Sequence, residues 1–514
     1  MKKIIVCLLC LFLIGSAISC TTPNTPSTDE TKAEQTSASD GTSASTGEES
    51  QDPYVDEIGE DVRFEGTDIR VIAASQSSNS IILAPEADTA ELVNSAVYNR
   101  NLAVEDRLGV SLILVDAISW DDGLYDIIYE SLNANSDDYD LIVGYGVVNI
   151  GLAAENMMAN LLEVEHLDLT KAYWNEKFST NASYGDRVYW ATGDISYNYL
   201  TSLYGCYVSK QVWADSVANE ESRSLYQVIE DGDWTYEALL GYSQLAERDM
   251  DGDLTINHEK DQVGLIGSPS HICNSLYFAM GGTYSQRDES GALSFSLESE
   301  KTMDLYAKLY GLFTAPKGVY NCGDGSIWND FAAINSFTQN RALFYIKQLE
   351  VVMMDVFRNM KPDDAFSVVV LPKNDEKQTE YHTLTFNGHP IVGIPYTVPA
   401  ERLSAVGATM ELMASEGYQT VYPAFYETAM KTRYSRDEES AKMIDMLRDS
   451  ATSDFAYIWS QRITGSGGVE MLLSNSINSG KAELSSTVAS HIGAYNESLS
   501  SLLERLSALQ ETEK

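Results

Sequence analysis

The sequence predicts an α/β fold, because short apolar segments typical of buried strands alternate with segments of helical periodicity. Three such strands are expected in the first part of the chain, at residues 69–74, 111–115 and 139–146. The last of these segments ends in a glycine turn. Strands that alternate with helices favour a mainly parallel sheet. The content of 44% hydrophobic and 10% aromatic residues is typical of a folded globular protein.

Helices are expected between these strands and through the middle of the chain. Residues 86–108 have one apolar face, formed by Leu92, Ala96, Asn99 and Ala103. From residue 153 the pattern becomes rich in helices, and apolar strands return at 366–371 and 390–398. Residues 403–414 have the pattern of an amphipathic helix.

The C-terminal region predicts one long amphipathic helix. Its apolar residues recur every three or four positions: Leu484, Val488, Ile492, Tyr495, Leu499, Leu502, Leu506 and Leu509. Two interpretations are open, a dimerising coiled coil and a helix packed on its own lobe. The second is favoured, and a monomer is expected.

The N-terminal region, residues 1–20, has the pattern of a secretory signal. Lys2 and Lys3 precede an apolar run at 4–14, which is shorter than the roughly 20 residues of a membrane-spanning helix. Residues 17–20 resemble a bacterial lipobox, in which the cysteine, here Cys20, is lipidated. This resemblance implies a protein attached by lipid to the extracellular face of a bacterial cell membrane. The alternative is a plain signal peptide that happens to contain a cysteine.

Residues 21–56 are rich in Ser, Thr and acidic side chains and poor in apolar ones. Such a segment cannot bury enough apolar surface to offset the entropy lost on ordering. We therefore expect a disordered tether between the lipid anchor and the folded body.

The charge balance is strongly acidic, with 76 Asp and Glu against 34 Lys and Arg and a net charge of −42. Such a surface repels nucleic acid and anionic lipid, so the lipid anchor is the only membrane contact expected and no nucleic-acid partner is expected. Neutral solutes and cations remain compatible with it.

Three cysteines remain outside the signal and its lipidation site: Cys206, Cys273 and Cys322. Their odd number and wide spacing form neither a disulfide framework nor a zinc pattern. One disulfide and three buried thiols are both open. The six histidines form no His-x-x-x-His arrangement, so no catalytic transition metal is expected.

Residues 249–261 carry a possible cation loop. Oxygen-bearing side chains occupy alternate positions from Asp249 to Asn257: Asp249, Asp251, Asp253, Thr255 and Asn257. They supply five ligands, counting the Thr255 carbonyl, and Asp261 or Glu259 is expected to complete the site. The loop resembles an EF-hand and the calcium loop of bacterial galactose-binding proteins, which implies a structural Ca²⁺. It departs from the EF-hand at Lys260, where a bidentate Glu belongs, and at Leu254, where a glycine belongs. A metal-free acidic turn is the alternative.

Several stretches together resemble the bacterial extracellular solute-binding proteins of the carbohydrate-uptake type, relatives of maltose-binding protein. They are residues 139–146, 186–194, 207–210, 233–237, 340–345, 366–373, 394–395 and 423–427. The resemblance implies a type II fold of two α/β lobes, with hinge crossovers and a ligand cleft between the lobes. Lobe 1 would comprise 66–148 and 373–430, and lobe 2 would comprise 149–372 and 431–510.

The same resemblance implies capture of a carbohydrate, an oligosaccharide in first expectation, and its delivery to an ABC-type permease. The residues expected in the cleft are Tyr145, Trp190, Asp194, Trp328, Lys347 and Trp459. Asp194 would accept hydroxyl hydrogens, and Trp328 and Trp459 would stack on the solute. For any one aromatic residue the alternative role is packing in the core.

Two other classes of protein compete with this prediction. A secreted carbohydrate-active hydrolase would need a catalytic pair, and Asp121–Asp122 or Asp137–Asp138 could imitate one. The sequence contains no Gly-x-Ser-x-Gly, no His-Glu-x-x-His and no phosphate-binding glycine loop. We therefore expect no enzyme, no catalytic residue and no catalytic cofactor. A surface receptor or adhesin would share the same fold.

Overall fold

The computed structural model describes residues 53–81, 92–323, 330–360, 366–431, 438–465 and 467–511. The chain divides into two units, Met1–Ser50 and Gln51–Lys514, and only the second contains described residues. The signal at 1–20 with Cys20, most of the tether and Trp328 therefore lie outside the described residues. None of the described helices is both long and apolar enough to cross a membrane.

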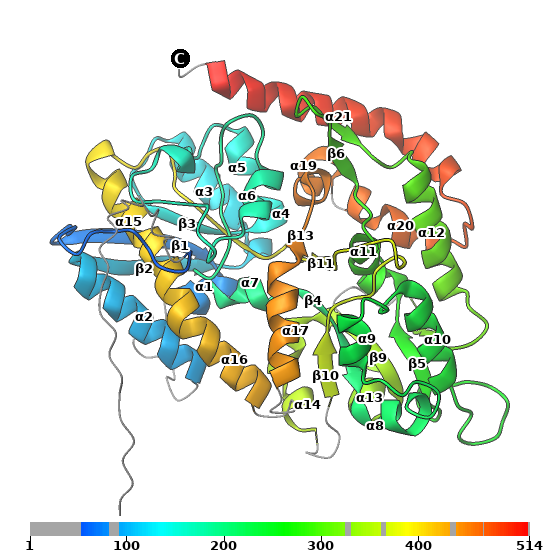
Figure 1. The fold of residues 1–514 in the computed structure, drawn as a ribbon. Helices are drawn as coiled ribbons and strands as arrows, with labels where there is room; N and C mark the ends of the chain where they lie inside the picture. Colours follow the sequence, from blue (N-terminus) through cyan, green and yellow to red (C-terminus); the bar gives the residue numbers. More distant parts are fainter. Residues whose placement is uncertain are drawn as a thin grey trace, which may run out of the picture. The chain divides into compact units, whose positions relative to one another are not determined.

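The first sheet has the strand order β12-β3-β1-β2 (Figure 1). β1 (Thr67–Ala74) lies in the middle and pairs in parallel with β2 (Val110–Ile118) and β3 (Leu141–Tyr145). β12 (Pro390–Gly393) returns much later in the chain and pairs antiparallel with β3. The three early strands coincide with the apolar segments in which the sequence predicted them, because each must bury side chains on this sheet.

The second sheet has the order β10-β4-β9-β5-β8 and mixes parallel and antiparallel pairs. Its strands are β4 (Tyr204–Ser209), β5 (Val263–Gly267), β8 (Val319–Asn321), β9 (Ala342–Gln348) and β10 (Phe366–Val369). β4, β5, β9 and β10 are buried along their whole length, so this sheet is covered on both faces. We call the first sheet with its packed elements lobe 1 and the second sheet with its packed elements lobe 2.

The helix α2 (Leu92–Leu108) packs on α15 (Ala400–Glu416) in lobe 1. The predicted inner face of α2, with Leu92 as its first residue, was wrong by one position. Leu92 is 47% exposed, and the buried face consists of Val93, Val97, Arg100, Asn101, Val104 and Leu108. This face carries more apolar surface than the predicted one, which explains why it is the face that is buried.

Buried Arg100 is held on this face of α2 by carbonyl groups. Its guanidinium donates to the carbonyl oxygen of Ile195 at 2.8 Å and to that of Ile81 at 2.5 Å. Burial of this cationic group lowers the pKa of Arg100 to about 9.

The other helices of lobe 1 and of the crossovers are α1 (Ser75–Ile81), α3 (Leu124–Asn133), α4 (Gly146–Asn149), α5 (Gly151–Ala154), α6 (Glu176–Ala182), α7 (Tyr197–Thr201) and α16 (Tyr422–Lys431). Lobe 2 and the late part of the chain add α8 (Lys210–Val212), α9 (Leu225–Glu230), α10 (Tyr236–Ala246), α11 (Pro269–Ala279), α12 (Glu300–Phe313), α13 (Phe331–Thr338), α14 (Asp355–Arg358), α17 (Glu438–Asp449), α18 (Phe455–Ile458), α19 (Ser460–Thr464), α20 (Leu472–Asn478) and α21 (Ser485–Glu511). A short hairpin is formed by β6 (Ser285–Arg287) and β7 (Leu293–Phe295).

The long C-terminal helix α21 packs against its own chain, in contact with α19 and α5 (Figure 1). Its apolar residues Val488, Leu499, Leu502 and Leu506 are buried in the large hydrophobic core. The apolar stripe that could have suggested a coiled coil is therefore used within the chain.

The crossovers between the lobes are joined by a small parallel sheet of β11 (Thr383–Leu384) and β13 (Ala451–Thr452). Leu203, next to β4, also bridges to Thr385. Backbone hydrogen bonds therefore connect chain segments that run between the lobes.

Parts of residues 161–195, which the prediction placed in lobe 2, pack on the sheet of lobe 1. Leu161, Trp174 and Ile195 pack in the same core as β1 and α15 of lobe 1. Ala191 and Val392 exchange backbone hydrogen bonds, which attach the segment to the sheet through β12. The tether is also shorter than predicted, because Asp56 pairs with Arg107 at 2.7 Å.

The three cysteines of the body are free thiols: Cys206 and Cys273 are buried and Cys322 is half-buried. Burial raises the pKa of each thiol. Of the two open interpretations, the structure therefore has free thiols rather than a disulfide.

Candidate functional site

A cavity of about 210 Å³ lies between the two lobes. Lobe 1 contributes Trp120 and Tyr145, and lobe 2 contributes Tyr204, Lys347 and Gln348. The crossover before β12 and the late helices add Phe386, Asn387, Tyr457, Gln461 and Glu470. Residues far apart in the sequence therefore meet at one concave surface.

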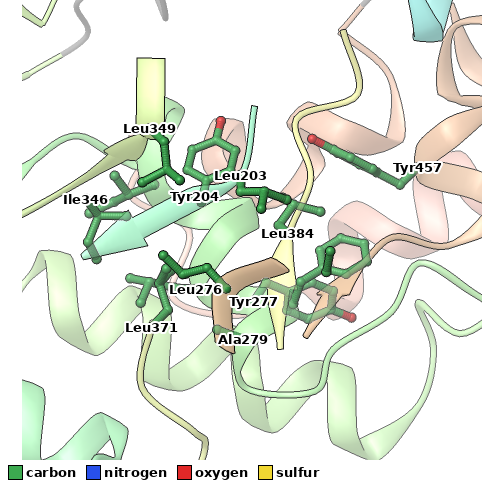
Figure 2. Packing of buried hydrophobic residues seen from close by; sticks show 14 of the residues in the cluster. Leu203, Tyr204, Leu276, Tyr277, Ala279, Ile346, Leu349, Leu371, Leu384 and Tyr457 are labelled. Atoms are coloured by element: carbon green, nitrogen blue, oxygen red, sulfur yellow. The ribbon is translucent and has the colours of Figure 1, made fainter. Parts of the chain in front are cut away.

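Aromatic rings form much of this cavity. Trp120 and Tyr145 are stacked with centroids 5.8 Å apart, and Phe386 meets Tyr145 edge-on at 6.5 Å. Figure 2 shows Tyr204 and Tyr457 among the buried residues near Leu384. Trp120 is 40% exposed, which is unusual for so large an apolar side chain. Such an arrangement can stack on a ring-shaped solute with apolar faces.

Tyr145 is fixed at the carboxyl end of β3. Its backbone N–H donates to Oδ1 of Asn149, the last residue of α4, at 2.8 Å. The ring lies against Gly388, where a Cβ atom would come within 2.2 Å of the Tyr145 hydroxyl oxygen. Only glycine at position 388 leaves this ring in place. Burial, with the nearby carboxylates of Glu350 and Glu470, raises the pKa of the Tyr145 phenol.

Lys347 lines the cavity from the end of β9, and its charge is compensated. Its Nζ lies 3.6 Å from Asp330 Oδ2, and both side chains are buried. The Tyr345 hydroxyl donates to the same Asp330 oxygen at 2.6 Å. The cavity therefore contains a lysine that already has a carboxylate partner.

Glu470 connects the crossover to the late helices. Its Oε2 accepts hydrogen bonds from Asn387 Nδ2 at 2.5 Å and from Ser460 Oγ at 2.9 Å. Asn274 on α11 donates to the Glu470 carbonyl oxygen at 2.8 Å. These bonds hold one wall of the cavity to lobe 2.

Of the residues predicted for the cleft, Tyr145 and Lys347 line the cavity. Trp190 and Trp459 lie in the hydrophobic core instead. Trp190 and Trp459 are each 2% exposed and line no part of this cavity. Trp459 stacks on Phe455 and donates from Nε1 to the Ala182 carbonyl oxygen at 2.9 Å. Neither indole can stack on a solute in this cavity, because a ring enclosed by its own chain has no free face.

Asp194 also lies away from this cavity. Its carboxylate forms a buried ion pair with Arg448 of α17. The Arg448 guanidinium lies 6.0, 5.0 and 5.5 Å from the ring centroids of Tyr54, Tyr418 and Tyr422. α17 packs on β10 of lobe 2, whereas the backbone around Asp194 packs on lobe 1. The carboxylate expected to bind hydroxyls therefore binds a guanidinium that reaches across from the other lobe.

Sequence reasoning missed Trp120, Tyr204, Phe386, Tyr457, Gln461 and Glu470. One usable signal existed for Trp120, which follows β2 as Tyr145 follows β3. Parallel neighbouring strands end at the same edge of a sheet, and ligands bind at that edge. The late residues carry no such local signal, because they reach the cavity only through the packing of α18, α19 and α20.

The predicted cation loop has part of the geometry that a cation needs. Carboxylate oxygens of Asp249, Asp251 and Asp253 all lie within 4.8 Å of one another. Leu254, at the position of the EF-hand glycine, has the left-handed φ of 66°. Three carboxylates so arranged fit Ca²⁺, which binds oxygen ligands in flexible geometry.

The carboxylates of this loop already accept backbone N–H groups, those of Asp249, Asp251 and Asp253 included. Asp261 accepts from the N–H groups of Met250 and Asn257, each at 2.8 Å. Asn257 Oδ1 accepts from the N–H of Glu259, and the Thr255 N–H donates to Asp253. In this arrangement Asp261 closes the loop, so calcium binding by the loop stays a prediction.

Comparison with known proteins gives a likeness in structure and none in sequence families. No family model matches the chain, and no curated protein matches it. The GacH receptor of Streptomyces glaucescens superposes with a TM-score of 0.53 at 12% identity, over 86% of this chain and 99% of that one. A cyclo/maltodextrin-binding protein complexed with maltotetraose gives 0.54 at 11% identity, over 86% and 98% of the two chains.

A third solved structure is the maltose/maltodextrin-binding domain MalE of Bdellovibrio bacteriovorus, bound to maltotriose. It superposes with a TM-score of 0.50 at 12% identity, over 84% of this chain and all of that one. These likenesses confirm the predicted fold. The chain has the two-lobed α/β fold of the type II periplasmic solute-binding proteins.

Proposed function

We propose that this protein is an extracellular solute-binding protein that captures a carbohydrate between its lobes and delivers it to an ABC-type permease. The observation that carries the proposal is the cavity between the lobes, where five aromatic rings meet polar side chains. Sugars present apolar C–H faces and a rim of hydroxyl groups, which this combination complements. The structural neighbours that bind maltotetraose and maltotriose support the proposal through their shared fold.

The residues that line the cavity come from both lobes, which explains how the protein can capture a solute. Trp120 and Tyr145 come from lobe 1, whereas Tyr204 and Gln348 come from lobe 2. A solute that contacts both walls has more contacts when the lobes are closed, so it shifts the population toward the closed form. A permease can then distinguish loaded from empty protein by the closed arrangement of the lobes.

We propose binding without catalysis. Among the described residues that line the cavity, Glu470 is the single carboxylic acid, whereas glycoside hydrolysis uses a pair of carboxyl groups. The adjacent acids Asp137 and Asp138 do not line the cavity, and Asp137 pairs with Arg70 at 2.6 Å. They are better explained as a charged surface than as a catalytic pair.

Calorimetric titration of the full chain with a panel of neutral mono-, di- and oligosaccharides tests the proposal. We expect saturable binding of at least one sugar, with the sugar recovered unchanged. Chromatography of the mixture after long incubation supplies the second measurement. Release of a shorter sugar would support the hydrolase instead, and the lack of binding by every sugar would overturn the proposal.

We also propose that Cys20 carries the lipid that attaches the protein to the outer face of the cell membrane. The support is the lipobox-like segment at 17–20. Mass spectrometry of the mature N-terminus should find a lipidated cysteine, and Cys20→Ala should release the protein into the medium. An unmodified N-terminus at another residue would contradict the proposal.

We further propose that the loop at 249–261 binds a structural Ca²⁺ through Asp249, Asp251 and Asp253. Excess Ca²⁺ should raise the melting temperature, and chelation should reverse the shift. Asp253→Asn should remove most of the shift, whereas Asp304→Asn on α12 is the matched control and should retain it. An equal shift in both variants would indicate an unspecific salt effect.

A further inference from the structure

The C-terminal helix α21 contacts both lobes. Near its middle, the ring centroid of Tyr495 lies 5.7 Å from that of Phe295 in β7 of lobe 2. Near its end, Arg505 pairs at 2.5 Å with Glu155, which directly follows α5. A helix of 27 residues is about 40 Å long, so different parts of it can lie on different lobes.

The chain that leads into α21 is attached to lobe 2. The carboxylate of Asp454, which precedes α18, accepts from the N–H of Tyr284 at 2.6 Å and from the Ser285 hydroxyl at 3.0 Å. The hydroxyl of Tyr306 on α12 donates to the carbonyl oxygen of Lys481, and α20 packs on α11. The beginning of α21 is therefore fixed on lobe 2.

The helices α4 and α5 are attached to lobe 1. The N–H of Gly146, where α4 begins, donates to the carbonyl oxygen of His389 at 3.0 Å. The N–H of Ala159, which follows α5, donates to the carbonyl oxygen of Ile394 at 2.8 Å. His389 directly precedes β12 and Ile394 directly follows it, and β12 is part of the first sheet. The ion pair between α21 and the end of α5 therefore connects the two lobes.

A second link between the lobes starts from α19, which packs against α21. The guanidinium of Arg462 lies 4.3 Å from the ring centroid of Tyr125 on α3, and its Nη2 donates to the Val148 carbonyl oxygen at 3.4 Å. The helix α3 lies between β2 and β3 in the chain and belongs to lobe 1. Gly151 makes room for this guanidinium, since a Cβ atom there would lie 1.9 Å from Arg462 Nε.

These contacts are not tightly packed. A cavity of about 410 Å³ lies between α5, α19 and α21, and both Arg462 and Arg505 line it. The Arg505 side chain is 50% exposed, and ion pairs that water reaches are weak. Gln461, the neighbour of Arg462, lines the inter-lobe cavity, so the contacts lie beside the candidate solute site. They can separate without the unfolding of any helix.

We propose that α21 is a releasable strap that favours the closed arrangement of the lobes through Arg505 with Glu155 and Arg462 with Tyr125. When the lobes open, α3 and α5 move away from the late helices, so both contacts must separate. The contacts therefore raise the fraction of closed molecules in the empty protein. A solute that binds the closed form finds more of it present, which raises its apparent affinity.

Small-angle X-ray scattering of the full chain without solute tests the strap. Each curve is analysed as a mixture of closed and open molecules. Arg505→Glu places two acids opposite each other, so we expect the ratio of open to closed molecules to rise about fivefold or more, with a larger radius of gyration. Glu504→Lys is the matched control, because Glu504 is the exposed neighbour of Arg505 on α21, and it should scatter like the wild type.

Two further variants separate the strap from a general change of charge or stability. Reversal of both charges, Glu155→Arg with Arg505→Glu, should restore the wild-type curve. Gly151→Ala should displace only the flexible end of Arg462 and raise the ratio of open to closed molecules by about twofold. If Arg505→Glu does not fold, Gly151→Ala and the double reversal decide.

Wild-type scattering in both Arg505→Glu and Gly151→Ala would overturn the strap. An equal change in Glu504→Lys, or a double reversal that stays open, would overturn it as well. The measurement uses no solute, so its result is independent of the proposed function. If no sugar binds, the proposed function fails and the strap can still be confirmed; if the variants do not open, only the strap fails.

Discussion

The carboxylates of Asp194 and Glu470 both contact residues from distant parts of the chain, but only that of Asp194 is paired with a cation. Asp194 is 3% exposed, and its charge is compensated by Arg448, which also lies against three tyrosine rings. Glu470 is half-buried at the cavity and receives hydrogen bonds from Asn387 and Ser460 but no cation within the described chain. A carboxylate with a cation holds the lobes together, whereas one with an open oxygen can bind a solute.

This difference indicates which carboxylate in this fold can accept a hydrogen bond from a solute. A buried ion pair gains attraction that offsets the loss of hydration, and its partner cannot be exchanged for a sugar hydroxyl. Glu470 is held by neutral donors at one oxygen only, so a hydroxyl can approach the other. Asp194 was predicted for the solute because of its chemistry, and Arg448 removes that possibility.

The largest expected effect is the loss of stability when the ion pair of Asp194 with Arg448 is broken. Arg448→Met leaves Asp194 buried without a cation and should lower the free energy of unfolding by about 3–5 kcal/mol. Urea unfolding followed by circular dichroism measures the loss. Lys442→Met, which breaks the exposed pair with Glu230, is the control and should cost less than about 1 kcal/mol. A similar small loss for both variants would show that the buried pair does not stabilise the protein.

A third carboxyl group, that of Glu411 on α15, is buried and, in the part of the chain that the structure describes, hydrogen-bonded only to neutral donors. It accepts hydrogen bonds from the Tyr173 hydroxyl and from Trp174 Nε1, the latter at 2.9 Å. Burial raises the pKa of Glu411 to about 7, from an ordinary value of 4.5. The folded protein therefore binds a proton more readily than the unfolded chain between about pH 4.5 and 7.

This raised pKa of Glu411 predicts a pH dependence of stability. Its contribution is fully present below about pH 4.5 and is lost as the pH rises through about 7, by about 3 kcal/mol at most. Unfolding free energies measured at pH 4.5, 6 and 7.5 should show this fall relative to Glu411→Gln. Glu401→Gln, exposed on the same helix, should follow the wild type. Parallel pH curves for wild type and Glu411→Gln would contradict the shift.

The smallest expected effect concerns the aromatic wall beside Glu470. Trp120→Ala should weaken sugar binding by about tenfold or more, equivalent to about 1.4 kcal/mol. Its stability should change by less than about 0.5 kcal/mol, because the side chain is 40% exposed. Tyr98→Ala is the matched control, since Tyr98 is 37% exposed on α2 and lines no part of the cavity. Retained affinity in Trp120→Ala would remove this ring from the binding site.

Local pattern predicted much of the fold. The apolar segment at 69–74 lies within β1, and the segments at 366–371 and 390–398 contain β10 and β12, since strands buried on both faces leave continuous apolar runs. The amphipathic segment 403–414 lies within α15. The inner face of α2 was wrong because periodicity defines a stripe, and the neighbouring stripe of valines buries more surface.

Local sequence pattern predicted fewer of the residues that line the cavity. Tyr145 was chosen because it follows a strand, and it lines the cavity. The family resemblance placed the segments of Trp190 and Trp459 at the cleft, but a tryptophan in the core has the same residue type as one that stacks on a solute. No local pattern indicates Gln461, because an amide on a short helix such as α19 has no distinctive spacing.

The amino-acid sequence by itself determined the alternation of strands and helices, because hydrophobic periodicity acts within a few residues of the chain. Only the tertiary structure decided which charges are compensated and which acceptors stay open. Asp194 and Arg448 are 254 residues apart in the chain, and Asn387 and Glu470 are 83 apart. Such partners are chosen by the packing of whole lobes and crossovers, which no local pattern encodes.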